Sequence, residues 1–229
     1  NVSPVIYDAV KHLFNRFADS LSKDSMDIGL TTLLKFDVET GNHPPIKDRC
    51  RSLNPTMKKD FQQLLKKWLK AKFVEPSESP YASALVPVRK KDGSYRYAVD
   101  FRALNRITTT DTYPVASALE NTANELLARS KIFSSIDITG AYWTIEATKS
   151  ARKKLAITTP MGLYQFRRMP FGPKNSGAYF ARLMNVVLQS LADRNVSLNY
   201  FDDTILGSQT PLEMVFTLAH FLFLMETAG

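Results

Sequence analysis

Two adjacent carboxylates, Asp202 and Asp203, are the residues of this chain best suited to chemistry. Residues 196–200 alternate between apolar and polar, and residues 204–206 are good strand formers, so the pattern predicts a hairpin with both carboxylates at its turn. Hairpin turns prefer Gly or Asn, and this one has neither, which is the kind of broken local rule expected at functional sites. Taken alone, an Asp-Asp pair is more often an ordinary turn, because Asp side chains hydrogen-bond nearby backbone groups.

A third carboxylate, Asp137, follows the strand-like run 131–136 and precedes a segment relaxed by Gly140. Carboxylates converging from neighbouring strands make an oxygen-rich site for hard cations, and Mg²⁺ is usually held by one or two of them plus substrate phosphates. Polymerases and nucleases place two such ions about 3.5–4 Å apart, where they act on the attacking and leaving oxygens. These residues therefore predict a two-metal phosphoryl-transfer site.

Five motifs resemble those of reverse transcriptases, in the same order and at similar distances. The Tyr-x-Asp-Asp box is matched by residues 200–203, and the other four motifs lie at residues 85–93, 99–105, 136–142 and 169–175. The Met-Pro-Phe-Gly form of the last motif is typical of gypsy-type LTR retrotransposons. The resemblance covers about residues 36–229 and is far more specific than any one motif.

The resemblance implies an α+β fold of the right-hand polymerase type, with fingers and palm and without a thumb. The expected division is an N-terminal extension over residues 1–35, fingers over 36–109 and 145–175, and palm over 110–144 and 176–229, the last of these truncated. Asn1 in place of Met fits a piece of a longer polyprotein, in which thumb and RNase H parts would follow.

The resemblance also implies roles for individual residues. Asp137, Asp202 and Asp203 are expected to be catalytic and to hold two Mg²⁺, for which Mn²⁺ can substitute, together with the backbone carbonyl of Ile138. The expected dNTP-binding residues are Lys90, Arg96, Ala141, Tyr142 and Phe171. The expected template contacts are Asp100, Arg102, Asn105 and Gly172, the first three matching the strand that carries the templating base.

Several of these assignments compete with simpler structural interpretations. Tyr142 matches the aromatic that excludes a 2′-hydroxyl, but a core tyrosine is the alternative, with Trp143 as the other occupant of the pocket. The basic hairpin tip around Lys90 matches a triphosphate clamp, but charge also makes an exposed hairpin soluble. Residues 173–179 depart from the family's usual Leu-Thr-Asn-Ala-Pro-Ala-Thr, because Gly177 replaces Pro and Lys174 adds a charge.

The elements that would position these residues follow from local patterns. Asn54 as N-cap and Pro55 at the first helical position predict a helix that Pro76 ends. Its polar face carries Lys58, Lys59, Lys66, Lys67, Lys70 and Lys72, which suit nucleic acid and solvent equally. Asp92-Gly93 predicts a hairpin over residues 84–101.

Further elements are expected towards the C-terminus. The pattern predicts a helix from Tyr113-Pro114 to Leu127, a second hairpin over residues 155–166, and a helix capped by Asn175 or Ser176 that extends to Leu191. Thr210 and Glu213 form a capping box that opens a strongly apolar last helix.

The bulk properties agree with a nucleic-acid enzyme without proving one. The chain has 229 residues and a net charge of +8, which favours anionic partners such as an RNA or DNA template–primer and dNTPs, although many basic proteins bind neither. Cys50 is the only cysteine, so an intrachain disulfide and a cysteine-based zinc site are excluded. No signal-like stretch or long apolar run is found, so we expect an intracellular, cytoplasmic location within virus-like particles and no membrane partner.

The leading hypothesis is an RNA-directed DNA polymerase core, a nucleotidyltransferase, that adds dNTPs to a primer 3′-hydroxyl. An RNA-dependent RNA polymerase with a similar palm is disfavoured by Tyr142, because such enzymes need room for a ribose hydroxyl. A non-catalytic nucleic-acid-binding remnant of a retroelement is the alternative from another class. Three retained carboxylates argue against it, because crowded carboxylates repel one another and have little structural use.

Overall fold

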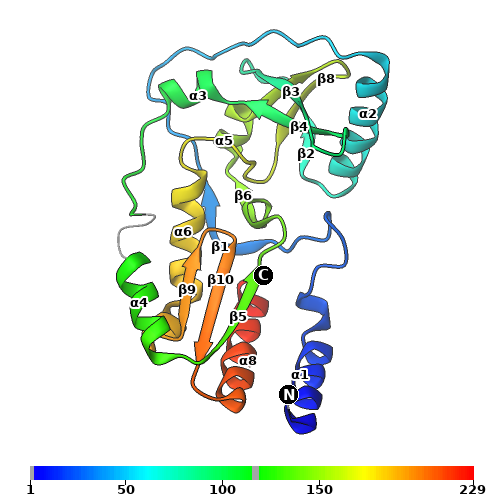
Figure 1. Ribbon diagram of the computed structural model, residues 1–229. Coiled ribbons are helices and arrows are strands. Elements are labelled where there is room, and N and C mark those ends of the chain that lie inside the picture. Colours follow the sequence, from blue (N-terminus) through cyan, green and yellow to red (C-terminus); the bar gives the residue numbers. More distant parts are fainter. Residues whose placement is uncertain (1–2, 115–118) are drawn as a thin grey trace. The chain divides into compact units, whose positions relative to one another are not determined.

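The computed structural model describes residues 3–114 and 119–229, which belong to two compact units (Figure 1). Unit 1 comprises Asn1–Leu33, Tyr113–Ala141 and Gly177–Gly229, and unit 2 comprises Leu34–Thr112 and Tyr142–Ser176. Both units mix helices with sheets, as predicted for the α+β class. Their assignment as palm and fingers stays a prediction.

Unit 1 is built on a three-stranded antiparallel sheet in the order β5-β10-β9. Its strands are β5 (Ile132–Asp137), β9 (Ser197–Tyr200) and β10 (Asp203–Ser208). Helix α4 (Leu119–Arg129) packs against β9 and β10, and helix α8 (Pro211–Ala228) packs against β10 and β5 (Figure 1). The remaining helices are α1 (Pro4–Arg16), η1 (Ala18–Ser20), α6 (Ser176–Val187) and α7 (Gln189–Ala192).

The close approach of α4 to the sheet requires a glycine in β10. A Cβ atom at Gly207 would lie 2.3 Å from Oγ of Ser130 and 2.7 Å from Cδ1 of Leu126, both shorter than real carbon contacts allow. The lack of a side chain therefore lets the end of α4 rest directly on the strand. Leu206, beside the glycine, is fully buried and anchors the same strand from its other face.

Helix α8 begins at the predicted capping box. The Thr210 hydroxyl accepts a hydrogen bond from the Glu213 backbone N–H, and the Glu213 carboxylate accepts one from the Thr210 N–H. Leu218, Phe221 and Leu222 are buried against the unit. By length and composition, α8 is also the one helix of the described ranges that could cross a membrane, a test that core helices of soluble proteins pass too.

Unit 2 contains a five-stranded sheet in the order β2-β8-β7-β3-β4, in which only the β3–β7 pair is parallel. The strands are β2 (Val74–Pro76), β3 (Ser83–Arg89), β4 (Tyr95–Asp100), β7 (Ala156–Thr159) and β8 (Gly162–Phe166). The helices are α2 (Pro55–Lys70), α3 (Arg102–Ile107), α5 (Lys149–Lys154) and the short η2 (Ala141–Thr144). A separate two-stranded sheet joins β1 (Thr31–Phe36) to β6 (Ile145–Ala147).

Helix α2 begins as predicted but ends earlier. The Asn54 side chain accepts a hydrogen bond from the Met57 N–H at 2.8 Å, and the predicted lysines are exposed. The helix ends at Lys70 and not at Pro76, because Lys72 adopts a left-handed conformation with φ 58°. Pro76 instead lies in β2, where it ends a three-residue edge strand.

Aromatic side chains form the core of unit 2. The Phe73 and Trp143 rings are stacked at 4.8 Å with an interplanar angle of 17°, and Trp68 and Phe166 both lie within 6 Å of Trp143. The Arg168 guanidinium lies 5.0 Å from the Phe73 ring and donates a hydrogen bond to the Trp143 carbonyl. Burial lowers the pKa of Arg168, with a further contribution from the neighbouring Arg167.

Other expected boundaries need correction. Arg102 and Asn105 lie in α3 and not in a strand; only Asp100 belongs to β4, because the chain turns into a helix at Phe101. The predicted helix start at Tyr113-Pro114 is wrong, because both residues are non-helical; α4 is described from Leu119, and residues 115–118 lie outside the described ranges. Helix α6 ends at Val187, and the short α7 follows it.

The segment predicted as an N-terminal extension, residues 1–35, contains helical structure. Helix α1 packs against α8 in unit 1, where Arg16 forms an exposed ion pair with Glu226. The segment also supplies the first residues of β1.

Candidate functional site

The three carboxylates predicted to be catalytic lie on adjacent strands of the unit 1 sheet. Asp203, the first residue of β10, is the register partner of Asp137, the last residue of β5. Directly opposed residues of an antiparallel pair carry their side chains on the same face, with Cβ atoms about 4.5–5.5 Å apart. Asp202 lies in the β9–β10 turn, and its backbone carbonyl accepts a hydrogen bond from the Ile138 N–H at 2.9 Å.

These carboxylates carry uncompensated negative charge. Asp137 and Asp203 are exposed and Asp202 is half-buried, and none of their side chains has a hydrogen-bond or ion-pair partner among residues 3–114 and 119–229. Like charges held on opposed strand positions destabilise a sheet. The cluster therefore costs stability and gains none from protein partners.

The turn that carries Asp202 is backbone-strained. Asp203 pairs with Tyr200, so Phe201 and Asp202 form a two-residue loop, and Phe201 has φ 54°. Positive φ is rare for a bulky residue, because its Cβ crowds the following carbonyl. The turn replaces the usual Gly with an aromatic residue, whose ring lies 4.8 Å from that of Tyr200 in an edge-to-face arrangement. Strain of this kind clusters at functional sites.

The chemistry of these side chains fits Mg²⁺, although no ready-made three-ligand site is formed. All three are carboxylates, the oxygen ligands that hard divalent cations prefer. Across the described part of the chain, however, no group of three or more His, Cys, Asp or Glu side chains is placed to hold a metal ion. The strand register thus places Asp137 directly opposite Asp203. Asp202 is adjacent to Asp203 along the chain, but the three side chains do not form a three-ligand metal site.

The segment after Asp137 forms a tight turn. The Ile138 carbonyl, predicted to bind metal, accepts a hydrogen bond from the Ala141 N–H at 3.2 Å, and Gly140 has φ 59°. A carbonyl oxygen has two lone pairs, so this bond leaves one for another ligand. Ala141, predicted to bind dNTP, is buried, with only 2% of its surface exposed.

The predicted triphosphate clamp lies at the tip of the β3–β4 hairpin in unit 2. Lys90 and Arg96 are exposed and have no ion-pair partner in the described ranges. The tip is ordered by the Asp92 carboxylate, which accepts hydrogen bonds from the Ser94 hydroxyl and N–H, and these bonds lower the pKa of Asp92. At the hairpin's base, the Tyr97 hydroxyl donates to the Met57 carbonyl of α2 at 2.7 Å.

Two predicted template contacts bind each other. The Arg102 guanidinium donates to both oxygens of Asp100 at 2.8 and 2.7 Å, and Arg51 adds a third bond at 3.2 Å. The hydrogen bonds from Arg102 hold the pKa of Asp100 at about 2, well below its ordinary value. The pair fixes the junction between β4 and α3, and most of the Arg102 side chain stays exposed.

The other two predicted template contacts, Asn105 and Gly172, are hydrogen-bonded to each other at the Met-Pro-Phe-Gly loop. The Asn105 side chain donates to the Gly172 carbonyl at 2.9 Å and accepts from the Lys174 N–H at 2.8 Å. Gly172 has φ 107°, and a Cβ there would lie 3.2 Å from the Phe101 ring, so both conformation and space favour glycine. Asn105 therefore holds the loop from the neighbouring helix.

Tyr142 and Phe171 lie together, whereas Trp143 does not share their site. The Tyr142 and Phe171 ring centroids are 4.7 Å apart, and Phe171 is 54% exposed. Trp143 is stacked in the aromatic core of unit 2. Because its ring is already packed there, Trp143 is the weaker candidate for the substrate-facing aromatic.

Lys174, which departs from the family pattern, and Asn175, which matches it, both bind the segment that follows α3. The Lys174 ammonium donates a hydrogen bond at 3.1 Å to the carbonyl of Thr108, the C-cap residue of α3. Asn175 donates from its side chain to the Thr109 carbonyl and accepts from the Asp111 N–H. These residues tie the loop to the segment that follows α3.

Sequence reasoning did not identify Asn175, nor a group of lysines on α5. The sequence indicates Asn175 only as a helix cap, because its bonds to a distant segment leave no local pattern. The α5 cations, Lys149, Lys153 and Lys154, do leave one, because residues 149–154 contain four positive charges among six positions.

Comparison with known proteins identifies the family of this chain. Residues 88–228, more than half of the chain, match the family described as "Reverse transcriptase (RNA-dependent DNA polymerase)". The chain belongs to the reverse transcriptase family. The match includes the hairpin tip, the Met-Pro-Phe-Gly loop and all three carboxylates.

Curated relatives of this reverse transcriptase chain include Pol polyproteins of LTR retrotransposons. It is 31% identical over 219 residues to the Retrovirus-related Pol polyprotein from transposon 297 of Drosophila melanogaster, with 91% of this chain covered. It is 28% identical to the corresponding polyprotein from transposon gypsy of the same fly, with 92% covered. The gypsy-type resemblance is thus confirmed, and the chain spans about a fifth of the length of these relatives, 20% and 21% respectively.

Solved structures show the same fold. The foamy viral protease-reverse transcriptase in complex with RNA/DNA hybrid superposes with a TM-score of 0.88 over the whole of this chain, at 22% identity and 30% coverage of the viral chain. A selenomethionine-labelled prototype foamy virus protease-reverse transcriptase gives a TM-score of 0.86 at 23% identity. The predicted α+β polymerase fold is therefore confirmed.

Proposed function

We propose that this chain is the fingers and palm of an RNA-directed DNA polymerase, which extends a primer 3′-hydroxyl with dNTPs on an RNA or DNA template. The observation that carries the proposal is the β5–β10 register, which places Asp137 opposite Asp203 and next to the strained Asp202 turn. Family membership supports the reaction class. The site on unit 1 supplies the negative charge that phosphoryl transfer with divalent cations requires.

In this proposal, Asp137, Asp202 and Asp203 hold two Mg²⁺, with the free lone pair of the Ile138 carbonyl as a further ligand. Two Mg²⁺, when bound, would neutralise charge on the triphosphate and activate the primer hydroxyl for displacement of pyrophosphate. The protein's own contribution is to hold these carboxylates unpaired at strand ends and in the β9–β10 turn, where no Lys or Arg of the described ranges lies within ion-pair distance of them. The half-buried Asp202 is restrained most strongly, because its turn is bonded to Ile138.

Lys90 and Arg96 bind the triphosphate in this scheme. Both are exposed at the tip of a hairpin that Asp92 and Ser94 stiffen from within. Cations that are already free of carboxylates lose no ion pair when phosphate binds, so their charge is fully available. Tyr142 supplies bulk against the sugar, and Phe171 supports its ring from one side.

Replacing Asp202 by Asn tests the proposal. The change removes charge from a turn and little packing, so Asp202→Asn is expected to abolish primer extension, by at least about 100-fold, while template–primer binding and folding persist. Extension is measured in a polypeptide that carries the C-terminal part of a gypsy-type Pol relative, and binding in the 229-residue chain itself. Asp193→Asn, an exposed carboxylate on the same unit, is the matched control and should leave extension unchanged. Full activity in Asp202→Asn would sink the two-metal assignment.

A non-catalytic nucleic-acid-binding remnant is kept as the second candidate, because the three carboxylates do not form a complete metal cluster in the described part of the chain. The two functions differ in how Mg²⁺ affects the folded protein. A catalytic site predicts that millimolar Mg²⁺ raises the melting temperature of the wild-type chain and not that of Asp137→Asn. A remnant predicts no such difference, and no extension by the longer polypeptide.

A further inference from the structure

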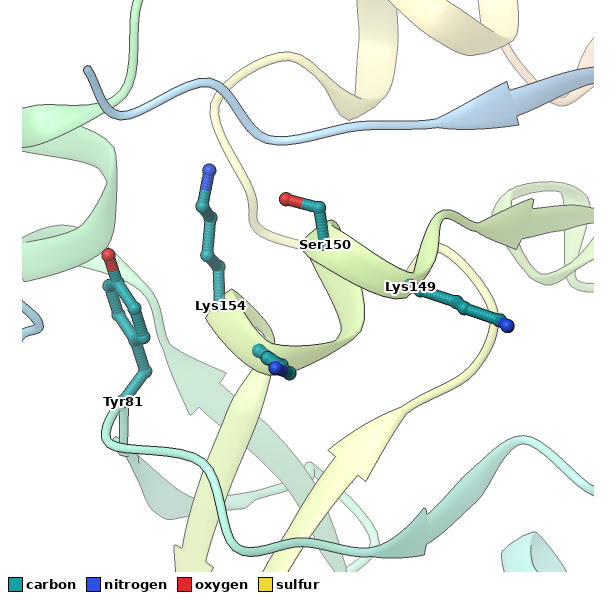
Figure 2. Close-up of a pocket in the computed structure, with 5 residues that line it drawn as sticks. Tyr81, Lys149, Ser150 and Lys154 are labelled. Carbon is teal, nitrogen blue, oxygen red and sulfur yellow. The ribbon is translucent and has the colours of Figure 1, made fainter. Parts of the chain in front are cut away.

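Unit 2 has a hollow of about 330 Å³ beside helix α5. Its lining consists of Tyr81, Lys149, Ser150, Lys153 and Lys154 (Figure 2). Four of these residues belong to α5, and Tyr81 lies two residues before β3. None of them has a role in the proposed catalytic site.

The hollow presents hydrogen-bond donors that the protein does not use. The Lys154 ammonium donates to the Val38 carbonyl at 2.5 Å, which holds it in place and leaves two of its three N–H groups available. The hydroxyls of Ser150 and Tyr81 have no partner among the described residues. Tyr81 is only 9% exposed, so its ring is fixed while its hydroxyl stays accessible. Figure 2 shows the polar ends of Tyr81, Ser150 and Lys154 on the same side of α5.

The remaining two lysines add positive charge around these donors. Lys149 and Lys153 are exposed and form no ion pair with any described carboxylate. Arg152 of the same helix, in contrast, is neutralised, because its guanidinium forms ion pairs with both Glu75 and Glu146. Lys149 and Lys153 are four residues apart on a helix, where like charges repel. The helix therefore carries unneutralised charge at a cost to its own stability.

The directions of the ammonium groups indicate the shape of the ligand. In Figure 2, Lys149 points away from the side of α5 on which Lys154 and Ser150 lie. A single small anion cannot satisfy cations that diverge in this way, whereas a chain of phosphates can contact each in turn. Hydroxyl and ammonium donors are the groups that bind phosphate oxygens in nucleic-acid interfaces.

We propose that this hollow binds the phosphodiester backbone of single-stranded nucleic acid, namely the part of the template that extends beyond the duplex. One phosphate would accept bonds from Ser150, Tyr81 and Lys154, and its neighbours would contact Lys149 and Lys153. The proposal rests on the proposed polymerase function and adds a binding site to it.

Two features favour a single strand over a duplex. Duplex DNA is stiff, with a persistence length of about 150 base pairs, and presents its phosphates on a convex surface, whereas a single strand can bend into a small hollow. The hollow also adjoins β3, which leads to the hairpin tip: Tyr81 precedes the strand and Arg89 ends it, at most about 26 Å away for eight residues at roughly 3.3 Å per residue. A single strand of nucleic acid that is bound by the hairpin at one end of β3 could therefore reach the hollow at the other end of β3 within a few nucleotides.

The test compares two fluorescent primer–templates that share one duplex and differ in the template's 5′ overhang, about 2 or about 12 nucleotides. Binding to the 229-residue chain is measured by anisotropy over a range of KCl concentrations. The wild type is expected to bind the long-overhang probe more tightly. Lys149→Ala/Lys153→Ala should lose about fivefold affinity for that probe and less than about twofold for the short one.

The salt dependence gives a second readout. Loss of two single-strand phosphate contacts should reduce the slope of log Kd against log[KCl] by about 1.4, at roughly 0.7 per contact, for the long probe only. Ser150→Ala should also weaken binding of the long-overhang probe, but without changing this slope. Lys149→Arg/Lys153→Arg should retain wild-type binding.

The matched control removes the same charge elsewhere. Lys11→Ala/Lys23→Ala changes two exposed lysines of unit 1 and should affect both probes equally and little. An equal loss for both probes in the α5 variant, or no loss, would overturn the proposal while leaving the polymerase assignment intact. Tighter, lysine-dependent binding of poly-glutamate than of the long probe would overturn it in favour of an acidic protein. A wild type that binds neither probe would contradict the proposed function as well.

Discussion

Tyr142 and Trp143 are adjacent in sequence, yet their surroundings differ. Both side chains are half-buried, but Trp143 is stacked on Phe73, while Tyr142 contacts Phe171, a residue with half of its surface exposed. The resemblance favoured Tyr142 as the substrate-facing aromatic and left Trp143 as the alternative, because both follow the same glycine turn. Their different partners are consistent with that order, and the substrate-facing role of Tyr142 stays a prediction.

Substitution at these positions should give opposite phenotypes. Tyr142→Ala is expected to raise ribonucleotide incorporation by about 100-fold relative to dNTPs, because a site that excludes by bulk relaxes when bulk is removed. Tyr142→Phe should keep the wild-type preference, since the ring and not the hydroxyl excludes. Steady-state incorporation by the extended polypeptide measures both, and an unchanged preference in Tyr142→Ala would move the gate to another side chain, such as Phe171.

Trp143→Ala is the contrasting variant. It should leave the sugar preference of the remaining active fraction unchanged and lower the free energy of unfolding by about 2–4 kcal/mol, because it opens a cavity beside Phe73 and Phe166. Urea denaturation followed by tryptophan fluorescence of Trp68 and by circular dichroism measures the loss. A stable Trp143→Ala with altered selectivity would reverse the two assignments.

The Asp100–Arg102 pair predicts a pH effect with a definite sign. Its folded pKa, about 2, lies below the ordinary value of 3.8, so the pair stabilises the protein above about pH 4 and this contribution is lost as pH falls towards 2. Asp100→Asn should therefore lower the free energy of unfolding at pH 7, by less than about 1 kcal/mol because the pair is near the surface. The difference from wild type should disappear near pH 2.

Urea unfolding at pH 7, 4 and 2.5 checks this, with Asp193→Asn as the control that should show no such pH dependence in its effect. A carboxyl NMR titration adds a direct measurement of the Asp100 midpoint. A midpoint near 4, or a stability difference that grows on acidification, would contradict the role given to Arg102.

At the scale of elements, much of the structure could be predicted because its signals are local. The Asn54 cap, the Thr210–Glu213 capping box and the hairpins around residues 92–93 and 201–202 all depend on residues a few positions apart. The sheet order could not be predicted, because β3 pairs in parallel with β7 across more than seventy positions. The β1–β6 pair was missed for the same reason.

The candidate site divides in the same way. The carboxylates, Lys90 and Arg96 could be named from motifs, which are contiguous in sequence. What Asn105 does could not, because its partners Gly172 and Lys174 lie more than sixty residues away. The positions of the metal ligands could not be predicted either. The motif indicated three carboxylate ligands, whereas the strand register places two of them, Asp137 and Asp203, directly opposite each other.

Gly207 tests how strongly α4 and β10 are fitted together. Gly207→Ala should lower the free energy of unfolding by about 1–3 kcal/mol, because the added methyl would overlap Ser130 and Leu126 and force α4 away from the strand. Thermal and urea unfolding of the chain measures the effect. Gly207→Ala/Ser130→Ala should recover part of the loss, since it removes the nearest atom but leaves Leu126. A neutral Gly207→Ala would show that α4 is free to move.

At the scale of the whole molecule, two features lead us to expect nucleic-acid binding without efficient DNA synthesis. One is the basic net charge, and the other is that the chain spans only about a fifth of the length of its relatives. Positioning a primer terminus to within about 1 Å is needed for phosphoryl transfer, and errors of that size can cost about 100-fold in rate. The net charge of +8 still supports attachment to template–primer. We therefore expect the 229-residue chain to bind template–primer with a steep salt dependence and to extend it little.

We expect helix α8 to promote self-association of the chain, because part of its apolar surface is exposed. Leu212, Phe216 and Phe223 are 55%, 65% and 53% exposed, and their spacing places them on one face of the helix. A continuous exposed apolar stripe of this kind marks an interaction surface. Phe216→Glu/Phe223→Lys should keep the chain monomeric at concentrations where the wild type associates, as measured by light scattering after gel filtration. Val5→Thr/Tyr7→Ser, which alters exposed apolar residues of α1, should not. A wild type that stays monomeric at about 100 μM, where a contact with Kd near 1 μM would be saturated, would show that this stripe is too weak to associate.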